Sequence, residues 1–289
     1  MRIAVVTDSH LGPEAHAFND NWRAVRAFVA DEAPDLTVHL GDITVDGAKD
    51  PADLQHAWAA SADWPTPIRF LPGNHDIGDN PPGPGVAASE PLRPARLADY
   101  RTIFGSDRWA LDAAGWCLIG LNAQLLGTDT GDEAEQWAWL TATLAAAPGR
   151  PVVLFLHKPL FQDSPADELP HQRYVPVAAR RRLFTLLAPV RLAAVVSGHV
   201  HQYRDRVVDS VRHLWMPSTA YFLPDEVQDR IGEKVTGIGM IELTPDRLRC
   251  HLVCPEGVTR HDALDHPVYP KLVEARSRLR AGRPIVPNK

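Results

Sequence analysis

Side chains that can bind metal ions recur in this sequence directly after short apolar runs. They occur at five places, in the order Asp8-Ser9-His10, Gly41-Asp42, Gly73-Asn74-His75-Asp76, His157 and Gly198-His199-Val200-His201. Leaving His75 and Asp76 aside, these places supply four imidazoles, two carboxylates and one amide. Such a mixture of nitrogen and oxygen donors suits Zn, Mn or Fe better than Mg or Ca. The donors outnumber the ligands of one tetrahedral ion, so the pattern predicts two metal ions that share a ligand and keep open positions for water and substrate.

The spacing within these places favours the same interpretation. Asp8-x-His10 and His199-x-His201 put alternate side chains on one side of an extended segment. A glycine precedes the donor at three of the places, where it permits a tight turn and close backbone approach. Each fragment alone has an ordinary explanation, since an Asn-His pair in a glycine turn can be a loop corner and His157 can be a satisfied strand-end histidine. Their joint occurrence at strand ends favours a metal site.

The remaining histidines lack this setting. His39 lies inside an expected strand, which predicts a core residue. The histidines without a functional prediction are His16, His56, His171, His213, His251, His261 and His266.

Five short apolar segments precede the donors, and we expect each to be a buried strand. They cover residues 2–7, 36–40, 68–71, 151–156 and 192–196. Open α/β sheets bind ligands beyond the carboxyl ends of adjacent strands, where loops that are distant in sequence converge. The five places are therefore predicted to form one centre.

Helices are expected between these strands. Asn19 or Asp20 is a candidate cap for the first helix, and Asp50-Pro51 is typical of the start of the second. Asp132 is the expected cap of a later helix that ends near residue 147. Two further helices are expected at residues 97–104 and 176–187.

The sequence pattern in much of the rest of the chain predicts β-strands. A hairpin around Gly115 is expected from residues 109–111 and 116–121. Antiparallel strands are expected at residues 203–208, 211–215, 238–243 and 248–253. Layer packing then predicts an α/β (α+β) fold with a β-sandwich core and helices on both outer faces. No linker is evident, so we expect one domain over residues 1–269 and a C-terminal tail over residues 270–289, made of a short solvated helix and a frayed end.

Composition narrows the class of protein. The 289 residues are 45% hydrophobic and 23% charged, which indicates a globular chain. The formal net charge of −6 argues against sequence-independent nucleic-acid binding. The three cysteines are an odd number without a C-x-x-C pair, which favours free thiols in a reducing compartment. No apolar run is long enough to span a membrane, and residue 2 already begins a strand with no leader before it, so we expect a cytoplasmic protein.

Taken in this order, the five places resemble the calcineurin-like metallophosphoesterase superfamily over residues 3–220. The resemblance implies a four-layer αββα sandwich with two mixed sheets flanked by helices. It implies a first metal held by Asp8, His10, Asp42 and His201. It implies a second metal held by Asp42, Asn74, His157 and His199, so that Asp42 bridges the two. His75 would face the substrate without binding metal, and Asp76 would orient His75 or a ligand from behind.

The resemblance also implies a mechanism. Two cations roughly 3.5–4 Å apart would clamp a phosphoryl group and acidify bound water. A bridging hydroxide would attack phosphorus in line, and His75 would stabilise the developing charge and protonate the leaving oxygen as general acid.

Differences among relatives narrow the expected substrate. Val45 stands where purple acid phosphatases carry a tyrosine ligand, and Asp76 stands where protein Ser/Thr phosphatases carry glutamate. The Gln136-x-x-x-Leu140 helix and the motif at residues 198–204 look most like bacterial class III cyclic-nucleotide phosphodiesterases and their relatives. Lys158 stands where those enzymes often carry a second histidine, a difference that is expected to alter how the rim of the site meets the leaving group.

The leading expectation is a binuclear phosphodiesterase that hydrolyses small phosphodiesters, with cyclic nucleotides among the candidates. The alternatives are a phosphomonoesterase, a glycerophosphodiester or nucleotide-pyrophosphate hydrolase, a nuclease, and a non-catalytic metal-binding scaffold. Intact Asp8, Asp42, His75 and His199 argue against the scaffold. A homo-oligomer stays open. The substrate is expected to meet residues 11–18, 77–94, 124–131 and 158–175, with Tyr203 and Arg204 as candidate contacts.

Overall fold

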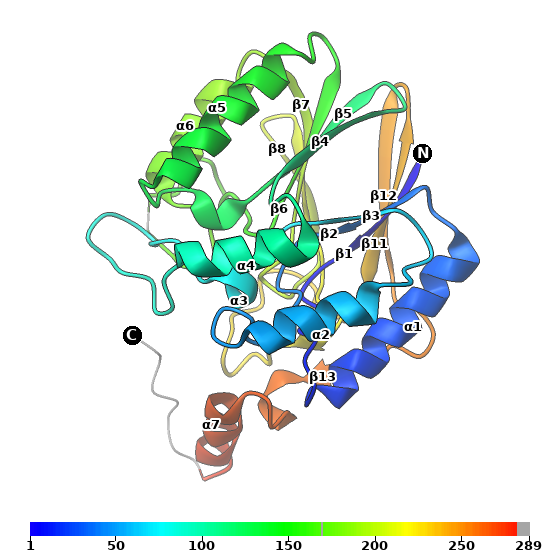
Figure 1. Ribbon diagram of the computed structural model, residues 1–289, viewed down its shortest axis with the longest axis vertical. Helices are drawn as coiled ribbons and strands as arrows, with labels where there is room; N and C mark the ends of the chain where they lie inside the picture. Colours follow the sequence, from blue (N-terminus) through cyan, green and yellow to red (C-terminus); the bar gives the residue numbers. More distant parts are fainter. Residues whose placement is uncertain (169, 282–289) are drawn as a thin grey trace.

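Two mixed β-sheets form the centre of the computed structural model, which describes residues 1–168 and 170–281 (Figure 1). The first sheet has the order β12 (Arg247–Val253), β11 (Ile238–Thr244), β1 (Arg2–Val6), β2 (Leu36–His39) and β3 (Ile68–Phe70). The second has the order β4 (Trp109–Ala113), β5 (Trp116–Leu121), β6 (Pro151–Leu156), β7 (Arg191–Ser197), β9 (Val211–Trp215) and β8 (Arg204–Val208). Within each sheet the strands that lead to the donor residues run parallel to one another, and antiparallel strands complete the sheet at its edges.

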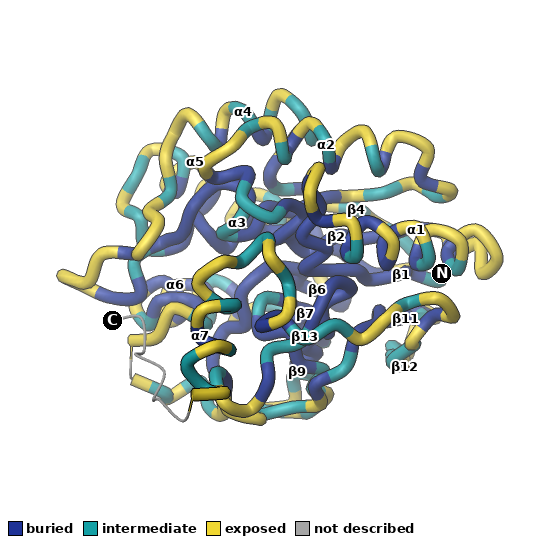
Figure 2. Tube along the Cα trace, turned by 90° about the horizontal axis from the view of Figure 1, so that it is seen from below, coloured by how far each residue is buried: buried dark blue, intermediate teal, exposed yellow. Residues whose placement is uncertain are grey.

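Helices cover the outer face of each sheet. Side chains of α1 (His16–Glu32), α2 (Pro51–Ser61) and α4 (Pro94–Phe104) share a core cluster with the first sheet. Side chains of α5 (Gly131–Ala145) and α6 (Val177–Leu187) share another with the second sheet. A third cluster joins the two sheets. The predicted four-layer sandwich is therefore confirmed, and Figure 2 shows its buried strands between partly exposed outer elements.

Alternation along the strands explains why they read as continuous apolar runs. Ile3 and Val5 of β1 face the second sheet, whereas Ala4 and Val6 face the helices. Both sets are fully buried. A strand that is covered on both faces has no polar side to show in its sequence.

Short elements complete the chain between and after these layers. They are α3 (Asn74–Ile77), the 3-10 turns η1 (Ala123–Leu125) and η2 (Ala263–Asp265), the strands β10 (Tyr221–Phe222) and β13 (His261–Asp262), and α7 (Pro270–Arg280). β10 and β13 pair in parallel, and α7 packs against η2.

Two predicted helix caps are wrong and one is confirmed. α1 begins at His16 with Ala15 as its cap residue, and the buried Asn19 instead donates to the carbonyl oxygen of Gly12. α5 is capped by Thr130, whose hydroxyl accepts from the Glu133 nitrogen, so Asp132 lies inside the first turn. Asp50 caps α2 as predicted, accepting from the Ala52 nitrogen.

Two expectations for the C-terminal third need correction. β9 is antiparallel to β8 but parallel to β7, because it joins the parallel centre of the second sheet. α7 is less solvated than expected, since Ala275 is buried and Leu272 packs in a cluster with Phe18 and Tyr221. The frayed end over residues 282–289 lies outside the described residues. Among the helices of residues 1–168 and 170–281, none is both long and apolar enough to cross a membrane.

The strands bring the donor loops to one end of the sandwich. The Asp8 nitrogen after β1 donates to the Gly41 carbonyl oxygen after β2, at 2.9 Å. The Gly198 nitrogen after β7 donates to the His157 carbonyl oxygen after β6, also at 2.9 Å. The His199 nitrogen donates to Oδ2 of Asp8 at 2.9 Å, which joins the loops of the two sheets.

Candidate metal centre

Two clusters of donor atoms lie where these loops meet. The first cluster consists of Asp8, His10 and His201, and the second cluster consists of Asp42, His157 and His199. Within each cluster the candidate ligand atoms lie within 4.8 Å of one another. Five of the six residues are buried and His199 is half-buried.

The atoms of the first cluster are spaced as the ligands of a cation would be. Nε2 of His201 lies 3.2 Å from Oδ1 of Asp8 and 3.3 Å from Nε2 of His10. Metal bonds of about 2.0–2.2 Å in tetrahedral geometry put ligand atoms about 3.3–3.6 Å apart. Oδ1 of Asp8 is buried and accepts no hydrogen bond from the described residues. A carboxylate oxygen in that state is costly unless a cation compensates it, so the residues of the first cluster fit a metal ion.

The second cluster converges on one imidazole nitrogen. Nε2 of His157 lies 3.3 Å from Oδ2 of Asp42, 3.3 Å from Oδ1 of Asn74 and 3.1 Å from Nδ1 of His199. One nitrogen cannot form good hydrogen bonds to three such groups at once, whereas a cation between them attracts all four. These residues therefore also fit a metal ion, and all seven residues offered by the sequence as ligands lie in or beside the two clusters.

The backbone is held in an unusual conformation at five of the seven residues. Asp8, His10, Asp42, His199 and His201 have φ values of 53°, 45°, 50°, 67° and 54°, in the left-handed region. Residues other than glycine adopt this region at a cost of roughly 1–3 kcal/mol each, and such residues cluster at functional sites. In this conformation the tight loops direct the side chains of these five residues towards the two clusters.

Two glycines allow the loops to approach this closely. A Cβ atom on Gly73 would lie 2.2 Å from Oδ1 of Asp42. A Cβ atom on Gly198 would lie 2.1 Å from Oγ1 of Thr7 and 2.7 Å from Oδ2 of Asp8. Both contacts are too short for any other residue, so these glycines are needed where carboxylates pass the backbone.

Burial and mutual charge shift the pKa values of the donors. Burial acts to raise the pKa of Asp42, but the neighbouring His157 and His75 outweigh it and hold that pKa well below its usual range. Burial acts to lower the pKa of His157, but the Asp42 carboxylate outweighs it and raises the pKa to about 9. Burial lowers the pKa of His10 and His199 well below 6.5, which favours the neutral imidazole that binds metal.

His75 belongs to neither cluster. Its Nδ1 lies 2.6 Å from the carbonyl oxygen of Val45, an acceptor, so Nδ1 carries the proton and Nε2 is left for the cleft. Its ring meets that of His10 edge-on, with 4.8 Å between the centroids. The carbonyl of Val45 thus orients His75, a contact that sequence analysis missed because a backbone oxygen has no sequence signal.

Asp76 supports the loop that carries Asp42. Its carboxylate accepts from the nitrogens of Gly73, Ile43 and Thr44 and from the Thr44 hydroxyl, at 2.8–3.2 Å. Burial, followed by the nearby Asp42, raises its pKa to about 6. Of the two expected tasks, these bonds favour support of a ligand over orientation of His75.

Lys158 is buried and does not reach the rim of the site, so the difference from the related enzymes at this position does not act through a rim contact of its side chain. Its side chain is fully buried, with Nζ 2.5 Å from Oδ1 of Asp79 and 2.7 Å from Oδ1 of Asn80. Gln124 donates to the same Asp79 oxygen at 3.0 Å. The ammonium group thus ties the loop after α3 to the strand end that carries His157, because the buried Asp79 needs a cationic partner.

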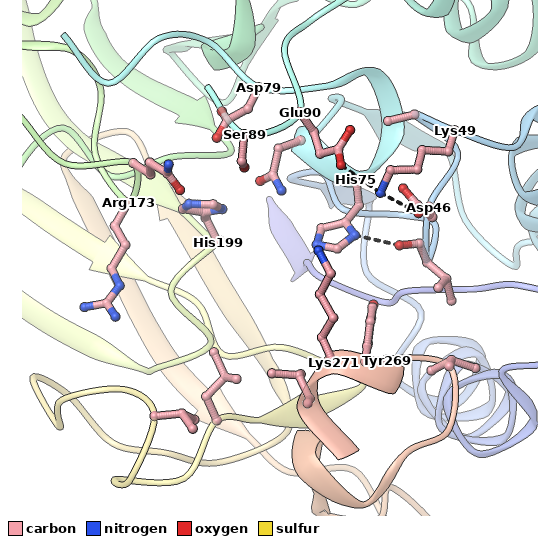
Figure 3. Close-up of a pocket in the computed structure, with 18 of the residues that line it drawn as sticks. Asp46, Lys49, His75, Asp79, Ser89, Glu90, Arg173, His199, Tyr269 and Lys271 are labelled. Atoms are coloured by element: carbon pink, nitrogen blue, oxygen red, sulfur yellow. Dashed lines mark hydrogen bonds and ion pairs between the residues drawn. The ribbon is translucent and has the colours of Figure 1, made fainter. Parts of the chain in front are cut away.

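A cleft of about 710 Å³ opens beside the two clusters (Figure 3). His75 and His199 lie in its walls, and residues 79, 89–90 and 171–173 come from two of the loops expected at the substrate. Residues 11–18 and 124–131 are not among its lining residues, and Arg204 is held by Asp163 and by the Gln162 carbonyl oxygen. Segments that sequence analysis did not place there also line the cleft, namely residues 45, 46, 48, 49, 223, 227, 228 and 268–272.

Comparisons with known proteins agree with this geometry. The family model for calcineurin-like phosphoesterases matches residues 1–203. The 3′,5′-cyclic adenosine monophosphate phosphodiesterase CpdA of Escherichia coli (strain K12) is 29% identical over 229 residues, covering 76% of this chain and 76% of that protein. The glycerophosphodiester phosphodiesterase GpdQ of Enterobacter lignolyticus (strain SCF1) is 26% identical over 242 residues, covering 78% of this chain and 79% of that protein.

A solved structure supports the fold. A dimetal phosphatase from Danio rerio superposes with a TM-score of 0.62 at 13% identity, covering 87% of this chain and 95% of that one. The match to the family model spans the strand ends that carry all seven donors and His75. This chain belongs to the calcineurin-like phosphoesterase family and is a metallophosphoesterase.

Proposed function

We propose that this protein is a binuclear metal-dependent phosphodiesterase that hydrolyses small phosphodiesters, with cyclic nucleotides among the candidate substrates. The observation that carries the proposal is the pair of donor clusters beside one cleft, with His75 next to both but part of neither. The metal ions would be Mn, Fe or Zn, which suit the mixed donors. Asp8, His10, Asp42 and His201 would hold the first, and Asp42, Asn74, His157 and His199 the second.

The residues around the clusters have separate tasks in this proposal. When bound, the two ions supply an acidified water as nucleophile and neutralise charge on the phosphoryl oxygens. His75 presents Nε2 to the cleft, from where it stabilises the developing charge and protonates the leaving oxygen. The Val45 carbonyl oxygen stabilises the protonated ring through Nδ1. Asp76 holds the Ile43–Thr44 backbone and thereby the position of Asp42.

The cleft suits an anionic substrate. Lys49, Arg173 and Lys271 contribute cationic side chains to its lining. Lys49 is paired with Asp46 and Glu90, whereas Arg173 and Lys271 have no ion-pair partner among the described residues. Both line the cleft, and Figure 3 shows Lys271 extending towards His75, so they are available to phosphate oxygens.

The names of the relatives favour a diester. CpdA is named for a cyclic nucleotide and GpdQ for glycerophosphodiesters, and both of these are phosphodiesters. A phosphomonoesterase or a nucleotide-pyrophosphate hydrolase is the second candidate, since the Danio rerio structure is titled a phosphatase. A non-catalytic scaffold would have no use for His75, and the net charge of −6 weighs against a nuclease.

An activity screen tests the proposal. The Mn-loaded protein is assayed on a bis-aryl phosphate, an aryl monophosphate, cAMP, a glycerophosphodiester and DNA. We expect the diesters of small molecules to be hydrolysed fastest. Faster hydrolysis of the monophosphate would favour the second candidate. If protein with two bound ions hydrolyses none of these esters, the result would favour the non-catalytic scaffold.

A further inference from the structure

The segment after β13 reaches the first cluster from outside the part of the chain that matches the family model. That match ends at residue 203, whereas Tyr269 stands between η2 and α7. Its hydroxyl lies 2.8 Å from Nδ1 of His10, a residue 259 positions away in the sequence. Figure 3 shows Tyr269 at the start of α7, below His75.

The contact holds the His10 ring with its other nitrogen towards the first cluster. Nε2 of His10 faces the first cluster, 3.3 Å from Nε2 of His201. A neutral imidazole that offers Nε2 to a metal carries its proton on Nδ1. The Nδ1–H group then donates to the Tyr269 oxygen, which fixes the rotation of the ring.

His201 is held in a comparable way by the neighbouring strand. Its Nδ1 lies 3.0 Å from the Tyr221 carbonyl oxygen, an acceptor, so Nε2 is left for the cation. β13, which leads into η2 and Tyr269, pairs with the same β10 strand through Tyr221 and His261. Both imidazoles of the first cluster are therefore oriented by residues beyond 203.

The second cluster shows the opposite arrangement. Nδ1 of His157 is buried and has no hydrogen-bond partner in the part of the chain that the structure describes. Its ring is placed by the fully buried strand end of β6 and by its contact with His199. The C-terminal segment thus supports one cluster selectively.

Tyr269 is itself held firmly. Its ring packs edge-on against those of His75 and Tyr221, with centroid distances of 6.0 and 5.5 Å. Arg276 of α7 pairs with Asp262 of β13 and with Asp265 of η2, which ties the helix to the strand before it. A side chain fixed on both sides loses little conformational entropy when it orients a ligand.

We propose that Tyr269 is a positioning residue that orients His10 for the metal ion of the first cluster, so that the C-terminal segment completes the metal centre. The inference rests on the metal centre of the proposed function but not on its substrate. It therefore predicts a difference between the two ions that is measurable without any phosphoester.

Mn binding to the full chain, measured by equilibrium dialysis, tests it. Tyr269→Phe keeps the ring and removes the hydroxyl, and we expect one of the two ions to bind about 10–100-fold more weakly while the other is unchanged. Tyr174→Phe is the matched control, since it removes a hydroxyl that bonds to the Gln162 side chain and not to a residue of either cluster. Unchanged binding of both ions would overturn the inference, as would equal weakening of both.

A double-mutant cycle identifies the ligand through which Tyr269 acts. In a His10→Ala background the first ion is already weakened, so adding Tyr269→Phe is expected to cause no further change. Additive weakening would show that Tyr269 acts elsewhere and would overturn the assignment.

Circular dichroism of the metal-free variants reports whether they fold. If Tyr269→Phe does not fold, Arg276→Ala, which loosens the same segment, is measured instead with the same expected result. Failure of the phosphodiesterase screen would leave these outcomes untouched.

Discussion

The Asp42 carboxylate accepts a hydrogen bond from the His75 backbone nitrogen at 2.8 Å through Oδ1, while its Oδ2 lies 3.3 Å from Nε2 of His157. One buried side chain therefore contacts both a member of the second cluster and the residue that we assign as general acid. Changes at Asp42 and at His75 should consequently have different signatures, because the first alters metal binding and the second alters only turnover.

Asp42→Asn should lose metal and activity together. The amide keeps the size of the side chain but removes the negative charge that the proposal assigns to both metal ions. Loss of residues that only support a ligand costs about 10–100-fold in affinity, so loss of a bridging ligand should cost more. Dialysis against Mn followed by metal analysis and a diesterase assay measures both quantities.

Asp20→Asn is the control for Asp42→Asn. It makes the same chemical change at an exposed carboxylate that is paired with Arg23. It should bind two ions and keep its activity. Full activity of Asp42→Asn with both ions bound would show that Asp42 is no bridge.

His75→Ala should keep both ions and lose turnover. General acid catalysis contributes typically about 10²–10⁴-fold, and most for leaving groups that need a proton. We expect kcat to fall strongly for an alkyl diester such as glycerophosphocholine and much less for an activated aryl diester. Equal slowing of both substrates would exclude a role as proton donor. His56→Ala, on α2, serves as the comparison.

Lys158→Met should destabilise the fold. The change leaves Asp79 as a buried carboxylate without its cation, and breaking such a pair costs about 3–5 kcal/mol. Urea unfolding of the wild type and the variant measures the difference in free energy of unfolding. The double variant with Asp79→Asn should recover part of the loss, since no charge is then left unpaired. A stability equal to the wild type in Lys158→Met would contradict the structural role.

The strands and the donor clusters could be predicted from the sequence for one physical reason. Strands buried on both faces give uninterrupted apolar runs, and a polar side chain right after such a run stands at a loop that converges with its neighbours. The boundaries of β1, β6 and β9 were accordingly predicted within one residue. The donors were found because they end such runs.

Other features had no signal in the sequence. Val45 acts through its backbone oxygen, and Tyr269 meets His10 only after the chain has turned back over 259 positions. The left-handed φ values of the donors cannot be read from Asp or His, which adopt them under tertiary constraint. Asn19 is of a residue type that commonly caps helices, but α1 begins one turn earlier. Its side chain therefore lies inside the helix and donates to the Gly12 carbonyl oxygen.

The stability of the fold should depend on pH through His213. This residue is buried against Phe161, and burial, followed by Arg206, lowers its pKa from 6.5 to about 4. The unfolded chain therefore binds a proton at a higher pH than the native state does. The contribution to stability is fully present above pH 6.5 and is lost as the pH falls towards 4, by up to about 3 kcal/mol.

His213→Asn isolates that contribution. The amide does not titrate, so the free energy of unfolding of the variant should vary less between pH 4 and 6.5 than that of the wild type. Urea unfolding at half-unit pH intervals measures both curves. Parallel curves would show that His213 does not titrate differently in the folded and unfolded chain.

A metal titration of the diesterase activity tests the central claim most directly. Metal-free protein receives zero to three equivalents of Mn per chain, and hydrolysis of bis(4-nitrophenyl) phosphate is measured with bound metal in the same samples. We predict little activity with one ion per chain and a steep rise that saturates at two, because both clusters must be filled. Full activity with a single bound ion, or no diester hydrolysis with two, would contradict a binuclear phosphodiesterase.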